Sequence, residues 1–185
     1  MIVSQLDSPV NSEQTSRAPS SGIQRPPEEI TALTSLSLSD GFFDGTVSSE
    51  IGMLTTLTGL DLRGNDLTGT IPNEIWLLTG LSSLIIDNNG LTGTIPTEVG
   101  DLHQLQRLNL YANTLTGTVP SEAGNLKQLI GLDLSMNNIT GPIPSEVGNL
   151  KHLIGLDLSI NRLNGPIPSE VGRPQAIRET PFVCQ

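Results

Sequence analysis

The chain of 185 residues has few aromatic side chains, one cysteine and few basic residues. Aromatic residues make up 3% of the sequence, so its core must be aliphatic. Cys184 is the only cysteine, which excludes an internal disulfide and a cysteine metal cluster. Nine Lys and Arg stand against 19 Asp and Glu, which gives a net charge of −10. This acidic balance argues against a nucleic-acid backbone or an anionic membrane as the partner.

Long apolar runs are also missing. No stretch reaches the roughly 18 apolar residues that a membrane-spanning helix needs, so we expect no membrane insertion by this chain. The first residues, MIVSQLDSPVNSEQ, lack a basic segment followed by an apolar one and do not predict a secretory signal. Residues 1–29 are rich in Ser, Pro, Gln and Glu, a composition that predicts a disordered leader.

The sequence does contain a string that returns every 24 residues. LTGTIPTEVG begins at Leu91, and close copies of it begin at Leu67, Leu115, Ile139 and Leu163. A fixed period of this size is typical of stacked repeats. The same seven columns are apolar in nearly every one of six units, which begin at Leu33, Leu57, Leu81, Leu105, Leu129 and Leu153.

Each unit has a short segment with the alternation of a strand. Leu60 and Leu62 flank Asp61, which is the period-2 pattern of a strand with one buried face. The later apolar positions are interrupted by Gly and Pro, which indicates turns and short helical pieces. One unit cannot bury its own leucines, so we expect the units to stack and their strands to pair in parallel. An Asn column would then bond buried backbone groups on both sides; it comprises Asn65, Asn89, Asn113, Asn137 and Asn161.

The units resemble the plant-type leucine-rich repeat, LxxLxLxxNxLxGxIPxxLgxLxx, as found in receptor-like kinase ectodomains and polygalacturonase-inhibiting proteins. The resemblance implies an α/β repeat solenoid, a right-handed superhelix with a parallel β-sheet on its concave face. It also implies short helical or irregular segments on the convex face and a second short strand near the LTG segment. We expect the solenoid to span residues 30–176 and residues 177–185 to form a tail or edge cover.

Both ends depart from the family pattern, because the paired cysteines of its terminal caps are missing. Whether the chain is a short complete protein or a fragment therefore stays open. The resemblance implies a cell-surface or extracellular location and a signalling role, whereas the N-terminus does not support secretion. Asn138 begins the only N-glycosylation sequon, which matters only in a secreted chain.

Catalytic and metal patterns are weak. His103 and His152 lie about two repeats apart and pair with neither a cysteine nor each other, so a surface position is expected. There is no nucleophilic triad, phosphate loop or metal-ligand spacing. A column of six glutamates indicates a solvated ridge, since one carboxylate per unit cannot build a calcium shell. We expect no enzyme activity, no cofactor and no metal.

The side chains that point out from the strands vary most in units two to four. They supply the candidate ligand-binding residues Arg63, Ile85, Asp87, Arg107, Asn109 and Tyr111. Arg and Tyr are common at binding hot spots. The alternative is that Arg63 and Asp87 only neutralise each other across the sheet.

The sequence therefore predicts a monomeric, non-catalytic scaffold that binds a protein or peptide ligand on its concave face. The resemblance places such a scaffold in a receptor-like ectodomain or a fragment of one. The alternative is an ice-binding or surface-binding protein that uses a stacked Thr-Gly-Thr ladder, which begins at Thr68, Thr92 and Thr116. Trp76 stands where other units have Gly, and we expect it to pack on the convex side.

Overall fold

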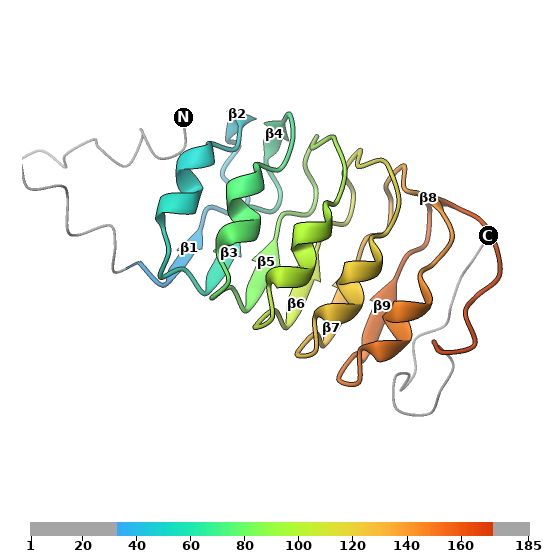
Figure 1. The fold of residues 1–185 in the computed structure, drawn as a ribbon. Helices are drawn as coiled ribbons and strands as arrows, with labels where there is room; N and C mark the ends of the chain where they lie inside the picture. The colour runs from blue at the N-terminus through green and yellow to red at the C-terminus, as the bar shows by residue number, and fades with distance from the viewer. Residues whose placement is uncertain (1–32, 172–185) are drawn as a thin grey trace, which may run out of the picture.

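The computed structural model describes residues 33–171, which form a stack of repeats (Figure 1). Within these residues six parallel strands build one sheet whose spatial order follows the sequence order. They are β1 (Ser35–Ser37), β3 (Gly59–Asp61), β5 (Ser83–Ile85), β6 (Arg107–Asn109), β7 (Gly131–Asp133) and β9 (Gly155–Asp157). Equivalent residues of neighbouring units pair directly, for example Leu60 with Leu84. The predicted α/β solenoid with one parallel sheet is confirmed.

A second line of parallel pairing runs along the stack. β2 (Asp44–Thr46) pairs with β4 (Asp66–Thr68), and β8 (Thr140–Gly141) pairs with β10 (Arg162–Leu163). Single bridges between successive units continue this line, at Thr70–Thr92, Thr94–Thr116 and Thr118–Thr140. These pairs confirm the second short strand near the LTG segment.

Short 3-10 helices stand side by side along the stack, across the core from the six-stranded sheet (Figure 1). Each of the described helices has five residues: η2 (Ser49–Met53), η3 (Asn73–Leu77), η4 (Thr97–Asp101), η5 (Ser121–Asn125) and η6 (Ser145–Asn149). A proline precedes η3 to η6, and its fixed φ sets the start of the turn. In η2 Ser48 takes that place, and its hydroxyl accepts the N–H of Glu50 at 3.2 Å.

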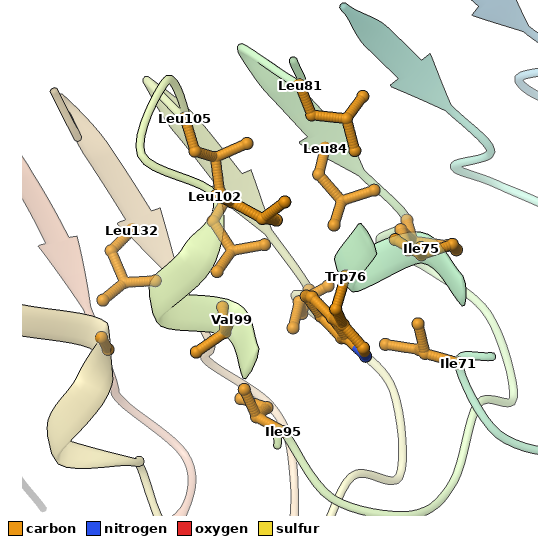
Figure 2. Close-up of a cluster of buried hydrophobic side chains, with 14 of the residues drawn as sticks. Ile71, Ile75, Trp76, Leu81, Leu84, Ile95, Val99, Leu102, Leu105 and Leu132 are labelled. Atoms are coloured by element: carbon orange, nitrogen blue, oxygen red, sulfur yellow. The ribbon is translucent and has the colours of Figure 1, made fainter. Parts of the chain in front are cut away.

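The core between the sheet and the helices is one continuous aliphatic cluster. Leu57, Leu81 and Leu105 are 0% exposed, as the repeat pattern requires. In the last described unit Leu156, Leu158 and Leu163 are only partly buried, because no unit follows them among the described residues. Figure 2 shows the middle of the cluster, where Trp76 is the one aromatic side chain among aliphatic neighbours.

The asparagine column joins each unit to the one before it. The Asn137 amide donates to the carbonyl of Leu134 in its own unit at 3.1 Å and to that of Leu110 in the preceding unit at 2.9 Å. Its side-chain oxygen accepts the N–H of Leu115 at 2.9 Å. Asn65, Asn89, Asn113 and Asn161 bond in the same way. The expectation that this column bonds backbone groups on both sides is confirmed.

Some expectations fall on parts of the chain that the structure does not describe. The leader at residues 1–29, the tail at residues 177–185 and Cys184 all lie outside the described residues. Within residues 33–171, none of the helices has the length and apolar character to cross a bilayer.

Candidate ligand-binding site

The open face of the six-stranded sheet carries the candidate site. The central leucine of each strand points into the core, so the residues on either side of it point outward. Because pairing is in register, equivalent residues form rows that run across neighbouring strands. One row contains Ser35, Gly59, Ser83, Arg107, Gly131 and Gly155, and another contains Ser37, Asp61, Ile85, Asn109, Asp133 and Asp157.

A depression of about 440 Å³ lies on this face and is called the groove below. Four of the six predicted binding residues line it: Arg63, Ile85, Arg107 and Asn109. Asp87 and Tyr111 do not. The groove extends past the predicted cluster into units five and six, where its lining includes Ile130, Gly131, Asp133, Gly155 and Asp157.

Arg63 pairs with an aspartate of its own unit. Its Nη2 atom lies 2.6 Å from Oδ2 of Asp61, and its backbone N–H donates to Oδ1 of the same carboxylate. The partner is therefore Asp61 and not Asp87, which the sequence had suggested as an alternative. The Arg63 side chain is 48% exposed. An ion pair so exposed contributes only about 0–1 kcal/mol, so a ligand can compete for the guanidinium.

Asp87 supports the groove through its hydrogen bond to Asn109. It is 6% exposed, and its two carboxylate oxygens accept hydrogen bonds from the amides of Asn88 at 2.7 Å and Asn109 at 2.9 Å. The side-chain oxygen of Asn109 accepts the N–H of Tyr111 at 3.0 Å. These bonds fix the orientation of the Asn109 amide. Asp87 therefore acts through Asn109 and does not itself line the groove.

Asp133 and Asp157 are groove residues that the sequence analysis missed. They pair in register on β7 and β9. In each, Oδ1 accepts the N–H and the hydroxyl of a serine two residues later, Ser135 or Ser159. Units five and six are near copies, so their outward residues stand out less in the sequence than those of the more variable units. The signal was the repetition itself, because two identical GLDLS segments place identical side chains on adjacent strands.

Gly131 and Gly155 make the floor of the groove bare. A Cβ added to either one would meet no heavy atom within 4 Å. Arg107 occupies the same row one strand earlier, and Ser83 the strand before that. This part of the groove is therefore open because Gly131 and Gly155 have no side chains.

The remaining sequence candidates lie elsewhere. Trp76 is 1% exposed and packs on the helix side of the core near Ile71, Ile95 and Val99 (Figure 2), as expected. His103 and His152 are exposed; His152 Nδ1 lies 2.8 Å from the carbonyl oxygen of Lys127. Among the described residues no three His, Cys, Asp or Glu side chains gather as a metal site would require.

The threonine ladder forms as the sequence suggested, and its side chains are exposed. Each hydroxyl in its first column donates to a glycine carbonyl of the preceding unit, at 3.0 to 3.2 Å. The donors are those of Thr68, Thr92, Thr116 and Thr140. These hydroxyls therefore hold neighbouring units together.

Comparison with known proteins agrees with this architecture. The family model for the Leucine Rich Repeat matches residues 56–78, 80–102, 104–126 and 128–150. No curated relative matches the chain in sequence. Many solved structures do match it in fold.

Three of the matching structures, all of Arabidopsis proteins, illustrate the similarity. The ectodomain of the receptor kinase GASSHO1/SCHENGEN3, in complex with CASPARIAN STRIP INTEGRITY FACTOR 2, is 42% identical with a TM-score of 0.78, covering 80% of this chain and 18% of that one. The HAESA ectodomain, in complex with an IDA peptide hormone ligand, is 38% identical with a TM-score of 0.67, covering 70% and 22%. The BIR3–SERK2 complex is 34% identical with a TM-score of 0.67, covering 80% and 78%.

The chain spans about a fifth of the GASSHO1 and HAESA ectodomains but more than two thirds of its match in the BIR3–SERK2 complex. The matched repeats and the similarity to these structures lead to the same family as the asparagine column and the in-register sheet. The chain belongs to the leucine-rich repeat family, and its structural neighbours are the ectodomains of plant receptor kinases.

Proposed function

We propose that the chain is a non-catalytic recognition scaffold that holds an extended peptide, or an extended segment of a protein, in the groove on the concave face. The observation that carries the proposal is the groove itself, where charged, amide and apolar side chains from adjacent strands surround a bare floor. HAESA is solved with a peptide hormone ligand, and RGFR1 is named a plant peptide hormone receptor. Those neighbours support a ligand of the same general kind here.

The groove suits such a ligand because much of its lining is already fixed. Of the strands that line the groove, β5, β6 and β7 are hydrogen-bonded to a strand on both sides and β9 on one, and the Asp87 network holds the amide of Asn109 in one orientation. Preorganised groups lose little conformational entropy when a ligand binds. A groove on a rigid repeat scaffold also gives an extended peptide several adjacent contact positions.

The proposed roles follow from position. Arg63 and Arg107 offer charged donors, Asn109 offers an amide, and Ile85 offers an apolar contact. Asp87 positions Asn109. Tyr111 is half-buried two residues after the end of β6, where it can contact a ligand that extends past Asn109.

Panning a random linear-peptide library against the full chain tests the proposal. Gly131→Tyr fills the groove, and the open space around Gly131 lets the fold keep its shape. Thr97→Tyr adds the same side chain at an exposed position of η4 and serves as the matched control. We expect enriched peptides that bind the wild type and Thr97→Tyr but not Gly131→Tyr. Equal binding to all three proteins, or no enriched peptide, would refute the proposal.

The exposed threonine ladder keeps a second candidate open, a surface-adsorbing or ice-binding role. Its regular spacing and exposure favour that role, whereas the use of its hydroxyl donors inside the solenoid does not. Thermal hysteresis that disappears in Thr92→Tyr and persists in Gly131→Tyr would favour the ladder over the groove.

A further inference from the structure

We infer that the groove selects ligands that carry a long basic side chain, arginine or lysine, with its methylene stem over Gly131 and Gly155 and its charged end at Asp133 and Asp157. The inference rests on the proposed function and adds the chemistry of the ligand. Four features of this face of the sheet support it.

The first feature is a pair of carboxylates that each keep one oxygen free. Asp133 and Asp157 use Oδ1 to accept from their serines, and within residues 33–171 no hydrogen bond or ion pair reaches either Oδ2. Paired strands lie about 4.8 Å apart, so the two negative charges face each other across a short gap. A cation between them relieves that repulsion. A guanidinium, with five N–H donors, can bond to both carboxylates at once.

The second feature is that the oxygens of Asp61 and Asp87, two other carboxylates of this face, already have partners. Asp61 holds the guanidinium of Arg63, and both oxygens of Asp87 accept amide hydrogen bonds. Asp133 and Asp157 are the acidic residues that line the groove, and their Oδ2 atoms have no partner within residues 33–171. A basic group of a ligand therefore gains the most binding free energy beside Asp133 and Asp157.

The third feature is an apolar path that leads to these carboxylates. Ile130 lines the groove and is 38% exposed, and Ile154 takes the equivalent place in the next unit at 59% exposed. Each isoleucine stands directly before a bare glycine, Gly131 or Gly155. Lysine and arginine carry three or four methylene groups below their charge, and such stems favour apolar surface while the head stays with polar groups. A short polar side chain could bond to the carboxylates but would not cover the apolar surface beside them.

The fourth feature is the charge on the neighbouring strand. Arg107 lies in the same row as Gly131 and lines the groove. Among the described residues it makes no ion pair, so its positive charge disfavours a basic ligand group near unit four. The ligand's basic side chain is thereby directed toward units five and six.

The experiment uses the peptide pools from the library and a double variant, Asp133→Asn with Asp157→Asn. Asparagine keeps the strand end intact, since Asn109 already accepts the equivalent N–H from Tyr111 at 3.0 Å. The control is Glu98→Gln with Glu122→Gln, which changes the net charge equally but lies on η4 and η5. It separates the groove from a general attraction between basic peptides and an acidic protein.

We expect peptides selected on the wild type to be enriched in Arg or Lys at one position. The best of them should bind the Asp133→Asn, Asp157→Asn variant about tenfold more weakly and the control variant equally well. Replacing the basic residue of that peptide by Gln should cause a similar loss on the wild type and little further loss on the double variant, which shows that the two changes remove one interaction.

The failures of the two proposals are distinguishable. Peptides that lose binding in Gly131→Tyr but show no basic enrichment, or that bind the Asp→Asn variant unchanged, would overturn this inference and leave the groove as the binding site. Peptides that bind Gly131→Tyr as well as the wild type would overturn both.

Discussion

The side-chain oxygen of Asn113 accepts a hydrogen bond from the backbone N–H of Leu91, 3.1 Å away in the preceding unit. The amide of the same side chain donates to the carbonyl of Ile86 at 3.0 Å. Asn113 is 8% exposed and Leu91 0%, so water has little access to the groups that this side chain satisfies. One asparagine therefore joins two units through bonds that solvent does not replace.

Asn113→Ala should lower the free energy of unfolding by about 1–3 kcal/mol, because it leaves the buried N–H of Leu91 unpaired, whereas the carbonyl of Ile86 still accepts from the amide of Asn89. Urea unfolding followed by circular dichroism measures the change. Asn138→Ala is the control, since the Asn138 side chain makes no hydrogen bond within the described residues and its loss should matter by less than about 0.5 kcal/mol. Equal losses in the two variants would show that the asparagine column does not stabilise the stack.

The sequence was sufficient for this column but not for the groove. A polar residue at a fixed place in an apolar repeat has to satisfy buried backbone groups, so the role of Asn113 follows from periodicity. Periodicity also sets the register and therefore which residues share a row. It does not show which neighbour a long side chain contacts, and Arg63 contacts Asp61 of its own unit. Nor does it show that Gly131 and Gly155 face open space, which depends on every neighbouring side chain.

Trp76→Ala should destabilise the fold by about 3–5 kcal/mol, because it removes a large buried side chain and leaves a cavity. Equivalent units have glycine here, and a Cβ at Gly100 would lie only 2.6 Å from the Glu122 carbonyl oxygen. The equivalent position at Gly100 therefore has no room for a side chain, whereas the indole of Trp76 fits in its own unit. Its N–H has no partner within the described residues, so the contribution comes from packing.

Chemical denaturation followed by circular dichroism measures this loss. Leu77→Ala is the control, since Leu77 is the next residue and is 70% exposed. Trp76 is also the only tryptophan of the chain. Its fluorescence in the folded protein should therefore be blue-shifted and resist quenching by iodide; strong quenching would contradict its burial.

Ile160→Asn should raise the free energy of unfolding by about 0.5–1 kcal/mol. Ile160 has a φ of 52°, in the left-handed region that disfavours β-branched residues, and its side chain is 69% exposed. Asn88 takes the same position in unit three with a φ of 53°, so asparagine fits this backbone. Thermal unfolding measures the gain. Ile154→Asn changes another exposed isoleucine outside the left-handed region and should not raise the free energy of unfolding. A gain there as well would show that removing an exposed apolar side chain, and not the backbone conformation, is the cause.

We expect a smaller effect on the free energy of unfolding when a ladder threonine is replaced. Thr92→Val removes the hydroxyl that donates to the carbonyl of Gly69 at 3.0 Å and keeps the branched shape of the side chain. The same carbonyl also accepts the N–H of Thr92 at 2.7 Å, so it is not left unpaired. We therefore expect a loss of only about 0.5–1 kcal/mol.

Thr94→Val provides the matched comparison for that loss. Thr94 is also exposed and lies on the second line of strand pairing, but its hydroxyl makes no hydrogen bond within the described residues. Its replacement should leave the free energy of unfolding within about 0.5 kcal/mol of the wild type. A loss for Thr92→Val alone, measured by urea unfolding, assigns the first threonine column to joining the units. Equal stability of both variants would instead free that column for a role at the surface, which thermal hysteresis measurements on Thr92→Tyr would then have to test.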